Sequence, residues 1–301
     1  MTFNERVKIE IINQNYDQNQ FEVIAAFFLY NNYLIFKIHE NNKPFLEIKS
    51  YFKPVLNFLA EHFQKFYKIN FELIIPENNK QIFRLIISDF ENVAWLNEIE
   101  LHCWKLSKNK NYYQAILIGI FLASGVVCDI ENKSYHTEIR LTDSFIEKLL
   151  VKILKRIRTN INYKISHYQK QSKLYLKQAE SISDFLKYLN AIEQMMYFEE
   201  QKILKDHLNQ QQRLNNLDVA NLSKVVQAAM DQIACIKKIQ NHQKYLELDH
   251  NIQKFMQIRL ENPELSLKDL SYLLTSKYQI QLTKSGLNHL VRKIKKIAAT
   301  L

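Results

Sequence analysis

Glycine is nearly absent from this sequence, since its 301 residues contain only three, at positions 119, 125 and 286. P-loops and dinucleotide-binding loops need several glycines within a few residues, so neither can be built here. The three cysteines lie far apart and form no CxxC spacing, at Cys103, Cys128 and Cys235. We therefore predict a reducing compartment and no structural metal. No HExxH motif is present either, and the sequence predicts no cofactor.

Long apolar segments are missing too. Ala115–Cys128 has no charged residue, but fourteen residues are too few to span a bilayer, and the segment is typical of a buried helix. Met1–Ile12 mixes charged and apolar residues and does not resemble a signal peptide. These features predict a cytoplasmic protein with no membrane partner.

Positive charge is abundant but unevenly placed. The formal net charge is +10, and 47% of the residues are hydrophobic, enough for a large core and two domains. Residues 151–175 carry seven basic and no acidic residues, and residues 251–301 carry nine basic and three acidic ones. Two such islands indicate localised binding of a polyanion rather than a general effect on solubility.

The C-terminal residues 266–301 have the pattern of a helix-turn-helix. Ser266 and Thr283 are suitable N-caps, and apolar residues recur at helical spacing after each of them. We expect a short first helix, a loop of about eight residues, and a second helix with one buried stripe. Leu287, Val291 and Ile294 belong to that stripe.

The opposite face of the second helix is polar and basic. Lys284 lies in the first turn, where the helix dipole disfavours a cation but the free N–H groups can hold a phosphate. Asn288 and Arg292, one turn apart, can each pair with base edges in the major groove. The alternative is an ordinary solvated helix face. The predicted DNA-binding residues are Ser266, Lys268, Thr283, Lys284, Ser285, Asn288, His289, Arg292, Lys293 and Lys296.

A repeat occupies the N-terminal two thirds of the chain. The order helix, two strands, long helix, two strands, helix occurs twice, with an offset of 91 to 93 residues between Ile24 and Leu117 and between Phe71 and Asn162. Two copies at a constant offset predict a pseudo-symmetric α+β domain over residues 1–190. Residues 191–216, polar around Asn209–Asn216, are expected to form a helical linker with a hinge, and residues 217–301 a four-helix domain.

The two apolar helices of the repeat resemble those of LAGLIDADG homing endonucleases. The segments are Leu117–Gly125 and Ile24–Asn32. In active members of that family each helix ends in a carboxylate that holds divalent metal ions at the scissile phosphate. The matching positions here are Asn31 and Ser124, neither of which is an anionic ligand. The resemblance therefore implies the fold without the catalytic chemistry, and no enzyme activity is expected.

Three further segments resemble the WhiA family, namely Tyr175–Leu186, Arg213–Ala229 and Leu282–Ile294. The family joins a degenerate LAGLIDADG domain to a helix-turn-helix domain similar to the promoter-binding domain of sigma factors. This resemblance implies a nucleoid-associated protein that binds double-stranded DNA, regulates transcription, and acts in cell division and chromosome segregation. RNA polymerase or another transcription regulator is the alternative partner. A structural division protein and an active endonuclease remain as competing interpretations.

Basic residues of the second repeat suggest a secondary contact with DNA. Lys164, Lys170 and Lys173 lie on or between strands that would line the DNA-facing saddle of such a fold. The first repeat is net acidic, so this contact should be weak and independent of sequence. A solvated strand pair is an equally good explanation of these lysines.

Overall fold

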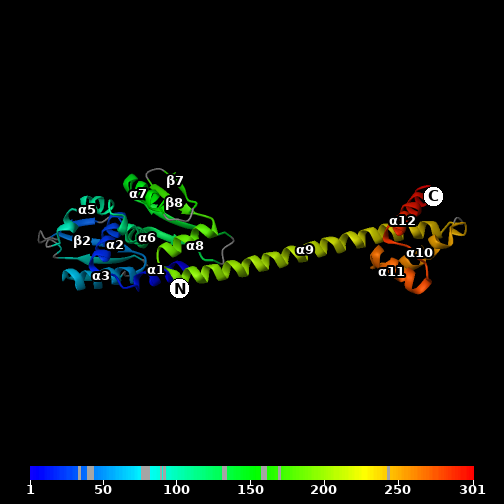
Figure 1. The fold of residues 1–301 in the computed structure, drawn as a ribbon, viewed down its shortest axis with the longest axis horizontal. Helices are drawn as coiled ribbons and strands as arrows, with labels where there is room; N and C mark the ends of the chain where they lie inside the picture. Colours follow the sequence, from blue (N-terminus) through cyan, green and yellow to red (C-terminus); the bar gives the residue numbers. More distant parts are fainter. Residues whose placement is uncertain are drawn as a thin grey trace. The chain divides into compact units, whose positions relative to one another are not determined.

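The computed structural model describes residues 1–32, 35–38, 44–75, 82–88, 90, 93–130, 134–156, 161–168, 171–242 and 245–301. They form two compact units, residues 1–205 and 206–301. The boundary between the units lies within helix α9 (Ile192–Gln240) and within the predicted linker. Each unit is shown in Figure 1.

The first half of the N-terminal unit is α+β. Its elements are α1 (Phe3–Ile12), α2 (Gln18–Asn31), β1 (Ile35–Ile38), β2 (Pro44–Ser50), α3 (Lys53–Tyr67), β3 (Phe71–Ile74), β4 (Phe83–Ile87), α4 (Ala94–Asn97) and α5 (Ile99–Leu106). The four strands form an antiparallel sheet in the order β1-β2-β4-β3. Leu46 and Ile48 of β2 are buried on its core face, and Glu47 between them is buried as well.

The second half repeats this arrangement. Its elements are α6 (Tyr113–Ser124), β5 (Gly125–Val127), β6 (Thr137–Leu141), α7 (Ser144–Leu154), β7 (Lys164–Tyr168), β8 (Gln171–Leu176) and α8 (Ala179–Tyr188). Its antiparallel sheet has the order β5-β6-β8-β7, strand for strand the same as the first sheet. The duplicated α+β architecture predicted from the offset is confirmed.

Helices α2 and α6 pack against each other at the centre of the unit (Figure 1). Both are apolar on nearly every side, as expected for helices buried all round. Gly119 sets the separation of the two backbones, because a Cβ atom there would lie 2.4 Å from the carbonyl oxygen of Ile24. Ala25 and Ala26 are fully buried in α2. Small residues therefore let the backbones of α2 and α6 approach closely near the middle of each helix.

Helix α1 was not predicted, although its sequence carries the signals of a helix. Thr2 and Glu5 form a capping box, and Phe3, Val7 and Ile11 are buried one turn apart. The helix is tied to the second repeat, since the backbone N–H of Phe3 donates to Asp129 at 2.7 Å. This helix breaks the pseudo-symmetry of the unit and brings its side chains to the ends of α2 and α6.

The C-terminal unit is helical. It contains the end of α9, followed by α10 (His250–Glu261), α11 (Leu267–Tyr278) and α12 (Lys284–Ala299). The predicted hinge at Asn209–Asn216 is wrong as a break in secondary structure, since α9 is helical throughout. Residues 192–240 contain no glycine or proline, so nothing in the backbone ends the helix there.

The predicted loop between the last two helices is too long. Helix α11 continues to Tyr278, and five residues, 279–283, connect it to α12. Gln279 ends α11 in the left-handed conformation with φ of 55°, the role that glycine usually takes at a helix C-terminus. Both predicted N-caps are present: Ser266 accepts from the N–H of Asp269, and Thr283 from that of Gly286.

Candidate nucleic-acid interface

Helix α12 has one buried and one exposed face. Leu287, Val291, Ile294 and Ala298 are buried and belong to the core that α12 shares with α9, α10 and α11. At 100° per residue these four positions cluster on one side of the helix. The opposite side is exposed and carries Ser285, Asn288, His289, Arg292, Lys293 and Lys296. The structure therefore places six of the predicted residues on one solvent-facing surface.

The other four predicted residues lie at the N-terminal ends of α11 and α12. Ser266 and Thr283 act as caps, whereas Lys268 and Lys284 are exposed in the first turns. Lys268 and Lys284 border the same cleft, of about 220 Å³. Two positive helix ends with free N–H groups beside two lysines form a surface suited to an anion.

Lys224 completes this cleft and was not predicted. It is exposed on α9 and faces the cleft together with Lys268 and Lys284. Its charge carried no signal in the sequence, because a lysine on a long polar helix is ordinary and only tertiary packing brings it to α11 and α12. Three lysines from three helices thus surround one cleft.

Arg259 holds the floor of the cleft in place. Its side chain is buried, and Nη1 donates to the carbonyl oxygen of Leu265 at 2.6 Å. Burial lowers the pKa of Arg259, and the nearby Glu264 opposes the shift. By binding the turn between α10 and α11, Arg259 fixes where α11 begins. Its Nε, like Oε1 of the buried Gln232, has no hydrogen-bond partner among the described residues.

Asn31 and Ser124, the positions that match the carboxylates of the LAGLIDADG helices, meet at the ends of α2 and α6. The amide nitrogen of Asn31 donates to Oγ of Ser124 at 2.8 Å, and Ser124 donates to the carbonyl oxygen of Arg140 at 2.7 Å. Thr142 donates to Oδ1 of Asn31 through both its N–H and its hydroxyl group, at 3.2 and 2.6 Å. Both polar atoms of the Asn31 side chain, Nδ2 and Oδ1, therefore have hydrogen-bond partners within the protein.

A divalent metal ion does not fit at these positions. The two side chains are neutral and bonded to each other, and the cationic residues Lys8 and Arg140 line the same cavity. Hard cations such as Mg²⁺ need carboxylate or other oxygen ligands and are repelled by such neighbours. In the described part of the chain no cluster of three His, Cys, Asp or Glu side chains suits a metal ion.

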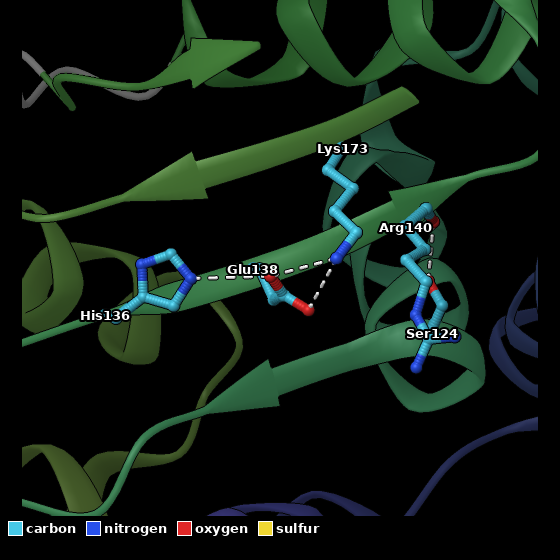
Figure 2. A network of polar contacts seen from close by, with 5 residues as sticks. All are labelled: Ser124, His136, Glu138, Arg140 and Lys173. Atoms are coloured by element: carbon cyan, nitrogen blue, oxygen red, sulfur yellow. Dashed lines mark hydrogen bonds and ion pairs between the residues drawn. The ribbon is translucent and has the colours of Figure 1, made fainter. Parts of the chain in front are cut away.

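The second sheet exposes a polar network on the face away from the core. Glu138 of β6 lies between His136 and Lys173, at 3.4 Å from each, as Figure 2 shows. Burial acts to raise the pKa of Glu138, but the hydrogen bond to His136 and the charge of Lys173 outweigh it and lower that pKa. The first sheet has a related arrangement, in which Glu47 lies 3.5 Å from Arg84.

Of the three lysines in the predicted secondary DNA contact, the structure describes Lys164 and Lys173. Pairing of β7 with β8 places Lys164 opposite Tyr175 and Ser166 opposite Lys173, so both lysines lie on the same sheet face. Lys164 is exposed, whereas Lys173 is paired with Glu138. Lys170 lies outside the described residues.

None of the described helices is both long enough and apolar enough to cross a membrane.

Comparisons with known proteins agree with this architecture. Residues 113–207 match the family model of the WhiA LAGLIDADG-like domain, and residues 212–298 match that of the WhiA C-terminal HTH domain. The full-length WhiA protein from Thermatoga maritima has a similar fold, with a TM-score of 0.57 and 21% identity, covering 100% of this chain and 99% of that one.

Two curated relatives are both named "Probable cell division protein WhiA". The protein from Lysinibacillus sphaericus is 29% identical over 100% of this chain and 98% of its own length. The protein from Oenococcus oeni is 34% identical over 62% of this chain and 59%, less than two thirds, of its own length. With its duplicated LAGLIDADG-like unit and its helix-turn-helix, the chain belongs to the WhiA family.

Proposed function

We propose that this protein is a DNA-binding regulator without nuclease activity that acts in cell division and chromosome segregation. The observation that carries the proposal is the exposed face of α12, where Asn288, Arg292 and Lys293 lie opposite the buried stripe of the same helix. The relatives named as cell division proteins support the cellular role. We expect the protein to act in the cytoplasm, at the nucleoid.

In this proposal α12 lies in the major groove of double-stranded DNA. Asn288 and Arg292 can each form two hydrogen bonds with the edge of a base and thereby read sequence. The cleft lysines Lys224, Lys268 and Lys284 would contact phosphates on the flanking backbone, which positions the helix without reading sequence. This division of roles gives each group of residues its own measurable effect.

Substitutions in α12 test these roles separately. Changing Asn288 or Arg292 to Ala should weaken binding to the preferred site by about 1–3 kcal/mol and relax its sequence preference. Lys284→Ala should weaken binding to all sequences alike and reduce the salt dependence by roughly one unit of slope. Leu287→Ala removes a fully buried side chain and should instead lower stability by about 2–5 kcal/mol.

Lys237→Ala is the matched control for the lysine variants. Lys237 is also exposed on α9 in the same unit, but it does not border the cleft. Fluorescence anisotropy with a selected duplex and a scrambled duplex, at several salt concentrations, measures all the variants. Unchanged affinity and preference in both Asn288→Ala and Arg292→Ala would assign recognition to another surface.

Purified protein also separates DNA binding from docking on RNA polymerase. The proposal expects the protein alone to bind its site, whereas a polymerase-associated factor would need the polymerase for stable occupancy. Chromatin immunoprecipitation with sequencing would identify the target sites. If the protein showed no affinity for DNA, a structural role in cell division would be favoured and the proposal would be contradicted.

A further inference from the structure

A basic cavity lies where the ends of α2 and α6 meet. It measures about 440 Å³ and is bordered by α1, the end of β2, β5 and β6. The charged residues on its wall are Glu5, Lys8, Lys49 and Arg140. Glu5 is already engaged, because it accepts from the backbone N–H of Thr2 at 2.8 Å. The cavity therefore presents an excess of positive charge.

Lys8 is the unusual member of this wall. Only 8% of its surface is exposed, and its ammonium group donates to a single described acceptor, the carbonyl oxygen of Leu122 at 3.3 Å. Among the described residues no carboxylate lies within 4.0 Å of Lys8 or of Arg140. A buried lysine is costly unless an anion pairs with it, since an ammonium group can make three hydrogen bonds.

Hydroxyl and amide groups surround these cations. Thr2, Asn4, Asn32 and Ser50 also line the cavity. Two cations with several neutral donors, and one carboxylate that is already engaged, match the oxygen atoms of a phosphate group better than a metal ion or an apolar ligand. The volume lies within the range of cavities that hold small molecules.

We propose that this cavity binds a phosphate group, which the Lys8 ammonium group and the Arg140 guanidinium group hold directly. Asn31 and Ser124, which match the carboxylate positions of the LAGLIDADG helices, line the same cavity. The phosphate group comes either from a free nucleotide or from the backbone of DNA, and the two sources are separable. The proposal is independent of base recognition by α12.

Binding measurements on the full chain test the site. Isothermal titration calorimetry with inorganic phosphate and with adenosine monophosphate should detect binding to the unmodified protein. Lys8→Met keeps an unbranched side chain that is one atom shorter and removes its charge, and Arg140→Gln removes the second cation. Each should lower the affinity at least about tenfold, because a charge-assisted hydrogen bond is lost. Lys105→Gln is the control, since Lys105 is exposed in the same unit and does not line the cavity.

The stability of each variant, measured in phosphate-free buffer, shows whether a variant that has lost phosphate affinity is still folded. Lys8→Met relieves a buried charge and should fold at least as well as the unmodified protein, and phosphate should raise the melting temperature of the unmodified protein only. Equal phosphate affinity in Lys8→Met and the unmodified protein would overturn the proposal. Failure of every phosphate probe, including duplex DNA, to distinguish the two proteins would do the same.

Binding measurements on the same variants distinguish the two sources of the phosphate group. If it belongs to a nucleotide, adenosine monophosphate binds and Lys8→Met leaves the affinity for a duplex unchanged. If it belongs to DNA, Lys8→Met weakens duplex binding while the mononucleotide binds no better than inorganic phosphate. Asn288→Ala should leave phosphate binding in the cavity intact in both cases, so failure of the proposed function in α12 is distinguishable from failure here.

Discussion

Raising the pH above about 8 should stabilise the N-terminal unit through Lys8. Burial, with a smaller effect from the charge of Arg140, lowers the pKa of Lys8 from 10.5 to about 8. Below that pH the lysine is charged in both the folded and the unfolded chain, and the full cost of burying the charge is present. Between about pH 8 and 10.5 only the unfolded chain keeps the proton, so stability rises with pH in this window.

The magnitude follows from the shift. One pKa unit corresponds to about 1.4 kcal/mol, so a change from 10.5 to about 8 amounts to about 3 kcal/mol in the free energy of unfolding. Other groups also titrate between about pH 8 and 10.5, but their effect on stability is the same in the Lys8→Met variant and cancels in the comparison. The difference in stability between the two proteins should therefore shrink by about 3 kcal/mol as the pH rises from 7 to 11.

Tryptophan fluorescence is a suitable probe for this unfolding. The chain has two tryptophans, Trp95 and Trp104, and both belong to the N-terminal unit. Urea titrations at several pH values then report that unit rather than the helical one, which matters because two units need not unfold together. Parallel stability curves for the unmodified protein and Lys8→Met would refute the reasoning, since Lys8 would then be charged and solvated in the folded state.

Three other predictions concern packing and chemistry. Gly119→Ala should destabilise the N-terminal unit by about 3 kcal/mol, because the added Cβ would meet the carbonyl oxygen of Ile24; an unchanged urea midpoint would show that α2 and α6 can separate. Gly286→Ala meets only ordinary contacts and should stabilise α12 by about 0.5–1 kcal/mol, measured by thermal unfolding. Pure protein should cleave no duplex with magnesium or manganese in a gel assay, and metal-dependent nicking lost on mutating Asp129 would place an active site elsewhere.

The elements that sequence analysis predicted are those whose signals are local. The period of apolar residues in α12 depends only on its own positions, so Leu287 and Ile294 could be assigned to the core and Arg292 to the surface. The repeat was visible because both halves carry the same order of helices and strands. Asn31 and Ser124 were predicted as a pair from the resemblance to the LAGLIDADG helices, and each does lie at the end of an apolar helix.

The features that were missed depend on tertiary contacts. Lys8 belongs to a short helix, and its hydrogen-bond partner, the carbonyl oxygen of Leu122 in α6, lies 114 residues later. Alternating charges concealed the narrow apolar stripe of this helix. Lys224 reaches the cleft only through the packing of α9 against α11 and α12. The hinge was wrongly predicted because polar composition alone does not end a helix that contains no glycine or proline.

The hydrogen bonds between Asn31, Ser124 and Thr142 also limit which side chains these two helix ends accept. An aspartate at either helix end would lose a donor and set a carboxylate against the carbonyl oxygen of Arg140, a cost that the cation of Lys8 on the same cavity would partly offset. A second aspartate would add a like charge beside the first. The pair therefore favours two neutral side chains, and replacing both with carboxylates should cost more stability than the sum of the two single changes.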